Sequence, residues 1–151
     1  MRYLSLAEAF VLGQMVTGID AVVLESASRT ELLDSALHAP QAGFGDDDFY
    51  SDFFMKAAVL CTRIARNHPL PDGNKRLAWI CLVTFCDLNG YELFVEKEEA
   101  VRTVVGVAAG EMSEDELRQW ISRFAIKMAY AQRRRKLRKR SWPDAVKMLS
   151  G

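Results

Sequence analysis

Two long apolar segments, residues 50–67 and 74–88, are separated by a six-residue loop that cannot be helical. The loop, residues 68–73, reads HPLPDG, and two prolines and a glycine in six positions exclude a helix interior. Each flanking segment is apolar on nearly every face, as is usual for helices at the centre of a bundle. The chain is therefore expected to fold as an all-α bundle around a central helix pair joined by a rigid loop.

Shorter helices are expected on either side of this pair. Ser5 with Glu8, and Ser113 with Glu116, have the spacing of a capping box, in which a serine begins a helix and a glutamate lies in its first turn. The other expected elements are helices at about residues 6–17, 30–37 and 97–109, a helix from residue 113 through Phe124 into the C-terminal basic segment, and one strand at residues 91–95.

The composition is that of an ordinary soluble domain: 151 residues, 50% hydrophobic and 26% charged. No apolar run reaches the roughly 20 residues that a membrane span needs, and the N-terminal segment lacks the features of a signal peptide. Cys61, Cys81 and Cys86 are odd in number and have apolar neighbours, which favours buried thiols over disulfides or a zinc site. We therefore expect a cytoplasmic protein without membrane attachment.

The net charge of zero conceals two segments of opposite sign. Residues 1–126 carry 11 Lys/Arg and 19 Asp/Glu, whereas residues 127–151 carry 9 Lys/Arg and one acid. We expect a principal domain over residues 1–126 and a basic, helical extension over residues 127–151. The run from Arg133 to Arg140 places seven cations in eight positions. It can bind nucleic-acid phosphates, pair with an acidic protein, or simply be a solvated helix end, and the sequence does not decide among these.

The loop opens the second central helix with features of an anion site. Free N–H groups at a helix N-terminus favour anions, and Gly73 lets the backbone approach a phosphate closely. Lys75 and Arg76 lie in the first turn, where the helix dipole disfavours cations unless an anion is bound between them. Solvated surface charges are the alternative interpretation for both residues.

Two further loop residues suit the transfer of a phosphorus-centred group. Asp72 offers a hard oxygen ligand for Mg²⁺ beside the anion site, although an aspartate here can also cap the following helix. His68 can accept a hydroxyl proton near neutral pH, or can be a structural loop histidine bonded to the backbone. Base, metal ligand and anion cradle within nine residues favour the catalytic interpretation. His38, in contrast, is expected to be a solvated loop residue.

The loop and the helix start, HPLPDGNKR at residues 68–76, resemble the loop of the Fic/Doc family, His-Pro-Phe-x-Asp/Glu-Gly-Asn-Gly/Lys-Arg. The Asn-Lys-Arg ending resembles the Doc, or death-on-curing toxin, branch in particular. Neighbouring matches are LLDSAL at 32–37, KAA at 56–58 and NGY at 89–91, so the resemblance covers about residues 1–124. It implies a Fic-type helical bundle with a short β-hairpin flap at residues 38–48, which docks the target polypeptide as an extended segment.

The resemblance also assigns roles to individual residues. His68 would be the general base, Asp72 would coordinate Mg²⁺, and Gly73, Asn74, Lys75 and Arg76 would hold the phosphates of ATP, with Lys75 and Arg76 also assigned to catalysis. Nucleotide-transferring Fic enzymes usually have Gly at the position of Lys75 and Arg at that of Trp79, so both departures resemble Doc. Leu70 replaces the usual Phe and is expected to change packing only. The Ser/Thr-x-x-x-Glu inhibitory helix of many Fic proteins is absent from the sequence.

The resemblance therefore implies a Doc-like toxin of a toxin–antitoxin system. It would be an ATP- and Mg²⁺-dependent phosphotransferase that modifies a Ser or Thr hydroxyl of a cytoplasmic protein such as elongation factor Tu, and a separate antitoxin would restrain it. One alternative is a Fic-type nucleotidyltransferase that transfers AMP. The other is a catalytically idle Fic-fold module that binds nucleic acid through its basic tail.

Overall fold

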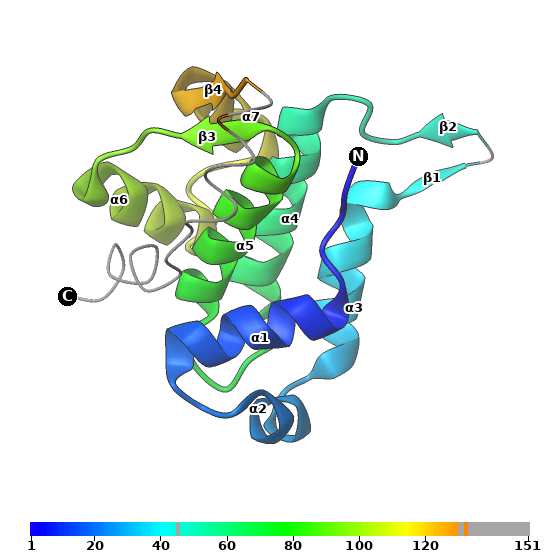
Figure 1. Ribbon diagram of the computed structural model, residues 1–151, viewed down its shortest axis with the longest axis vertical. Coiled ribbons are helices and arrows are strands. Elements are labelled where there is room, and N and C mark those ends of the chain that lie inside the picture. The colour runs from blue at the N-terminus through cyan, green and yellow to red at the C-terminus, as the bar shows by residue number, and fades with distance from the viewer. Residues whose placement is uncertain (45, 130–131, 133–151) are drawn as a thin grey trace.

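The computed structural model describes residues 1–44, 46–129 and 132 (Figure 1). The described elements are α1 Leu6–Thr17, α2 Ala21–Ala27, α3 Thr30–His38, the short 3-10 helix η1 Ala39–Gln41, β1 Gly43–Phe44, β2 Asp47–Asp48, α4 Phe53–Asn67, α5 Asn74–Leu88, β3 Tyr91–Leu93, α6 Lys97–Ala108, α7 Glu114–Phe124 and β4 Ala125–Lys127. The described chain is thus mainly helical with two small antiparallel sheets, which confirms the predicted all-α bundle. The run from Arg133 to Arg140 lies outside the described residues.

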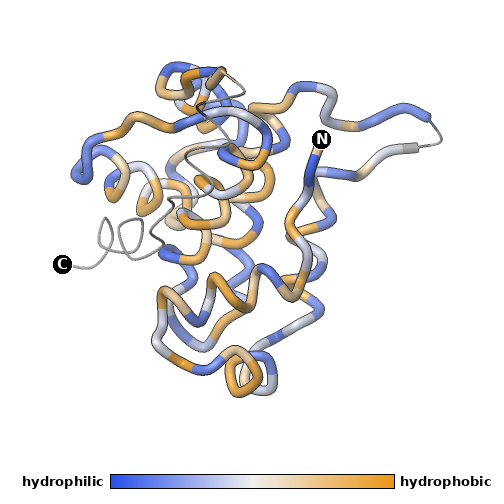
Figure 2. The backbone as a smooth tube through the Cα atoms, viewed as in Figure 1, coloured by the Kyte–Doolittle hydropathy of each residue, from blue (hydrophilic) through white to orange (hydrophobic). Residues whose placement is uncertain are grey.

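The central pair predicted from the apolar segments is α4 and α5, which lie side by side in the middle of the bundle (Figure 1). Many hydrophobic residues of both helices are buried in the core. Figure 2 shows stretches of hydrophobic colour along the two helices. Trp79 of α5 is 1% exposed and packs edge-on against Trp120 of α7, with ring centroids 6.3 Å apart. Cys61 is fully buried, and burial raises the pKa of its thiol to about 12. The cysteines are therefore core residues, as predicted.

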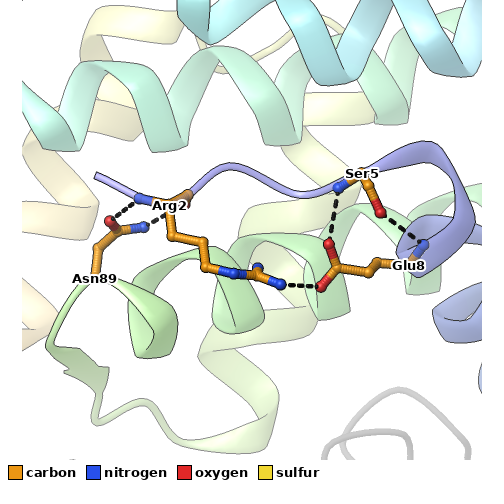
Figure 3. A network of polar contacts seen from close by, with 4 residues as sticks. All are labelled: Arg2, Ser5, Glu8 and Asn89. Atoms are coloured by element: carbon orange, nitrogen blue, oxygen red, sulfur yellow. Dashed lines mark hydrogen bonds and ion pairs between the residues drawn. The ribbon is translucent and has the colours of Figure 1, made fainter.

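Both predicted capping boxes are present. Ser5 accepts from the main-chain N–H of Glu8, and the Glu8 carboxylate accepts in return from Ser5 N–H. The guanidinium of Arg2 donates to the same carboxylate, and the main chain of Arg2 makes two hydrogen bonds with the side chain of Asn89, just after α5 (Figure 3). Burial acts to raise the pKa of Glu8, but the hydrogen bonds from Arg2 and Ser5 outweigh it, so that the pKa is lowered. This network attaches the N-terminal segment to the C-terminal end of α5, the end away from the loop that joins α4 to α5.

Within residues 38–48, His38 ends α3, and η1 and the β1–β2 hairpin follow, in agreement with the short β-hairpin predicted here. A buried lysine of α4 holds the base of this hairpin. The Nζ atom of Lys56 donates to the Pro40 carbonyl at 2.8 Å, lies 3.5 Å from Asp48 Oδ2, and sits 5.8 Å from the ring centroid of Tyr3. The side chain of Lys56 is 2% exposed.

The structure differs from the predicted elements in two places. The helix that begins after Ser113 does not continue into the basic segment, because α7 ends at Phe124 and β4 pairs with β3, with Leu93 opposite Ala125 and Tyr91 opposite Lys127. The helix α2 was not predicted. It spans only seven residues with a single buried side chain, too short for a clear apolar period.

None of the described helices is by itself both long and apolar enough to cross a membrane. Only α1 and α2 taken together, as a pair bent by 101°, meet those requirements of length and composition.

Candidate functional site

The loop between the two central helices forms part of a cleft of about 370 Å³. His68 follows the end of α4 in the left-handed backbone conformation, with φ 49° and ψ 57°. Gly73 precedes α5 with φ 83°. The cleft is lined by His68, Pro71, Asp72, Gly73, Asn74, Lys75 and Arg76, together with Val101, Val104 and Val105 of α6. The structure therefore brings together every residue that the sequence assigned to the site, and adds an apolar wall.

The N-terminus of α5 has no side-chain cap. Its N-cap residue, Gly73, has no side chain to bond the free N–H groups of the first turn. A Cβ atom at this position would meet Thr17 Cγ2 at 3.1 Å and an Arg76 guanidinium nitrogen at 3.3 Å, in addition to the strain of a positive φ. A glycine is thus required here, and it leaves the first-turn N–H groups open to the cleft.

The two cations of this turn are held differently. Arg76 donates to the Val16 carbonyl near the end of α1 at 2.7 Å and lies 3.9 Å from Asp72 Oδ2. Lys75 is exposed and makes no ion pair with any described residue. A cation in this position is unfavourable at a helix N-terminus until an anion binds beside it. Arg76 is therefore fixed before ligand binding, whereas Lys75 is free to meet a ligand.

The side chain of Asn74 is bonded within the loop. Its amide group accepts from Leu70 N–H at 2.8 Å and donates to the Leu70 carbonyl at 3.0 Å. These bonds close the loop upon itself and anchor Leu70, which is 4% exposed and packs in the core as expected. What Asn74 offers to an anion is its main-chain N–H.

Asp72 is the carboxylate available for a metal ion in the cleft. Its side chain is 94% exposed and does not cap α5, which leaves its oxygens accessible. Among the described residues, no three His, Cys, Asp or Glu side chains gather into a metal site. Mg²⁺ is commonly held by one or two carboxylates together with substrate phosphates, so one exposed aspartate beside the open N–H groups fits that ion.

Other residues singled out in the sequence lie outside the cleft. His38 is exposed at the end of α3, where Nδ1 lies 2.9 Å from the Asp34 carbonyl oxygen. The β1–β2 hairpin leaves the bundle where α4 begins, whereas His68 follows the opposite end of that helix (Figure 1). A helix of 15 residues is about 22 Å long. The structure therefore does not place the hairpin beside His68.

Sequence reasoning missed one residue that contacts the loop. Arg29, at the start of α3, donates from its main-chain N–H to the Pro69 carbonyl at 2.8 Å and from its guanidinium to the His68 carbonyl at 2.7 Å. It is separated from the loop by 39 residues and belongs to no recognisable motif. No signal in the sequence distinguishes it from other surface arginines.

Comparison with known proteins finds sequence similarity to a family and to a curated protein. The model of the Fic/DOC family matches residues 4–86. Toxin Doc of Mycolicibacterium smegmatis (strain ATCC 700084 / mc(2)155) is 48% identical over 62 residues, which are 41% of this chain and 48% of that protein. The chain thus spans about half the length of the curated relative that it matches.

Proposed function

This chain belongs to the Fic/DOC family, and from that premise and the geometry of the cleft we propose that it transfers the γ-phosphate of ATP to a Ser or Thr hydroxyl of a protein. The observation that carries the proposal is the meeting of His68, Asp72 and the open N-terminus of α5 in one cleft. A base, a metal ligand and an anion cradle are the parts that phosphoryl transfer needs.

His68 acts as the general base in this proposal. Its imidazole takes the proton of the target hydroxyl while the hydroxyl oxygen bonds to the γ-phosphorus. The bond between that phosphorus and the oxygen bridging to the β-phosphate breaks, and ADP leaves. General bases of this kind contribute about 10²–10⁴-fold to a rate.

The start of α5 holds the phosphates. The main-chain N–H groups after Gly73 and the ammonium group of Lys75 would bind the negative charge of the triphosphate, and Arg76 is already oriented by its bond to the Val16 carbonyl. Asp72 would hold Mg²⁺, which neutralises phosphate charge when bound. The valines of α6 supply an apolar surface for the rest of the nucleotide.

Two features support attack on the γ-phosphorus rather than the α-phosphorus. Lys75 places a cation where nucleotide-transferring relatives usually have glycine. Trp79, where they usually have a second arginine, is buried against Trp120 and offers nothing to a phosphate. Transfer of AMP is the alternative within the same reaction class.

The biological setting is proposed from the relative. Toxin Doc is named as a toxin. We infer that this chain is likewise a toxin acting in the cytoplasm on a component of translation such as elongation factor Tu, and that an antitoxin protein restrains it.

The reaction can be tested before the target has been identified. Purified protein is incubated with bacterial lysate and either γ-labelled or α-labelled ATP, and the labelled proteins are separated on a gel. We expect a protein band that carries label from the γ position only. Label from the α position would identify a nucleotidyltransferase, and no label from either would exclude transfer to protein.

A further inference from the structure

The end of α4 lacks the main-chain bond that usually closes a helix. His68 takes the left-handed conformation there, and it is the one non-glycine residue with positive φ in the part of the chain that the structure describes. Such an end is normally closed by an N–H of the following residue, which here is Pro69 and has none. The last carbonyl groups of α4 therefore need a donor from elsewhere.

Arg29 supplies a donor for the last carbonyl group of α4 and for the two carbonyl groups that follow it. Its guanidinium donates to the His68 carbonyl at 2.7 Å and, more distantly, to the Asn67 carbonyl at 3.5 Å, while its main-chain N–H donates to the Pro69 carbonyl at 2.8 Å. Three successive carbonyl groups, the last of α4 and the first two of the loop, are thus bonded to one residue of a different helix.

We propose that Arg29 is a positioning residue that holds the backbone of His68 in the left-handed conformation and so directs its imidazole into the cleft. The left-handed region is unfavourable for a residue with a Cβ atom, and it persists only where neighbouring contacts impose it. A change in φ and ψ at this residue would swing the Cα–Cβ bond and move the imidazole away from the hydroxyl it serves.

The side chain of Arg29 has no other role in the described structure that would explain these contacts. It is exposed, and although the residue lies at the N-cap position of α3, its side chain makes no capping hydrogen bond. On the other side of the loop, Asn74 holds Leu70 independently. Replacement of the side chain would leave the main-chain bond to Pro69 and the Asn74 contacts in place, so the fold should survive.

The conformational part of the proposal can be measured on the full-length protein without any substrate. A residue with positive φ gives a strong intraresidue NOE between its amide and α protons. We expect this NOE at His68 in the wild-type protein, its weakening in Arg29→Ala, and partial recovery in Arg29→Lys, since an ammonium group can reach one of the two carbonyls. The matched control is Arg2→Ala, which removes an exposed guanidinium bonded to Glu8 and should leave the His68 signal unchanged.

The effect of Arg29 on catalysis rests on the proposed function. It should appear as a change in kcat without a matching change in KM. With γ-labelled ATP and lysate, we expect Arg29→Ala to lower kcat about 10–100-fold, since small misplacements of a catalytic group cost up to about that factor. The KM for ATP should change little, because Arg29 does not line the cleft. Arg29→Lys should recover part of the rate.

The two hypotheses fail in different ways. If the wild-type protein labels no protein, the proposed reaction is wrong. The NOE measurement still tests whether Arg29 holds the backbone conformation of His68, because it needs no substrate. An Arg29→Ala variant that keeps the His68 NOE and a kcat within about twofold of wild type overturns the positioning role.

Discussion

At the scale of the residue, His68 combines strained backbone geometry with little packing. Its side chain is exposed at the cleft, so few contacts hold it and few would be lost with it. Its main-chain carbonyl accepts from the Arg29 guanidinium, and the carbonyl of the next residue, Pro69, accepts from Arg29 N–H. The residue is therefore suited to a role in chemistry rather than in stability.

Replacement of His68 by alanine should separate activity from stability. We expect transfer to fall at least 10²–10⁴-fold, because the proton acceptor is lost. The free energy of unfolding in urea should change by less than about 0.5 kcal/mol, as for other surface positions. His38→Ala, which removes an exposed histidine outside the cleft, should match wild type in both measurements. Wild-type rates in His68→Ala would show that another group is the base.

The sequence predicted the contiguous residues of the cleft and missed those that come from elsewhere in the chain, namely the α6 valines of the cleft wall and Arg29 behind the loop. A loop framed by prolines between two apolar helices must place its own residues together, so His68, Asp72 and Arg76 were accessible to sequence reasoning. Arg29 reaches the loop only through the packing of α3 beside α4, which no local pattern specifies. The bonds between the Asn74 side chain and the main chain of Leu70 were likewise not predicted, and the role of Asn74 in holding phosphate stays a prediction.

At the scale of the element, the hairpin depends on a contact from α4. The β1–β2 pair has only two pairs of opposite residues, Gly43 with Asp48 and Phe44 with Asp47, and so short a ladder is not stable alone. The buried ammonium group of Lys56 joins η1, at Pro40, to the second strand of the hairpin, at Asp48. Lys56 thus links α4 to both sides of the hairpin.

Replacement of Lys56 by methionine should loosen the hairpin. The Pro40 carbonyl would lose its charged donor, so we expect a loss of about 1–3 kcal/mol in the free energy of unfolding. Hydrogen exchange at the Phe49 amide, which donates to Ala42 across the hairpin base, should accelerate. Asp48→Asn should cost less than about 1 kcal/mol, because that carboxylate is 57% exposed.

The matched control for these two variants is Asp47→Asn, an exposed neighbour without a contact to Lys56 among the described residues. It should leave exchange at Phe49 unchanged. If Lys56→Met also leaves it unchanged, the hairpin is held by its own strands and not by α4.

Elements with capping boxes or long apolar patterns were predicted closely, as α1, α5 and α7 show at their starts. The strand β4 was not, because three residues contain no periodicity and its partner β3 lies more than 30 residues away. The pattern of helix formers around Phe124 favoured continuation, and pairing with β3 overrides that local preference.

At the scale of the whole molecule, the acidic domain and the basic extension meet near β4. Lys127 pairs with Tyr91, and Met128 donates to the Gly90 carbonyl at 2.8 Å, so these first residues of the predicted extension belong to the folded body. The cleft and both central helices precede them. The proposed catalytic residues and the basic run therefore lie in different parts of the sequence.

Truncation should separate these two parts. A chain that ends after Ala131 keeps β4, and we expect it to fold and to transfer phosphate at a rate within about twofold of the full-length rate. A chain that ends after Phe124 loses the pairing with β3 and should be less stable in urea.

If the basic run binds nucleic acid, only the full-length protein should shift an RNA or DNA probe at low salt. The shift should fade steeply as salt rises, because phosphate contacts release counterions. Loss of transfer in a folded chain that ends after Ala131 would instead place the extension in the target-docking surface.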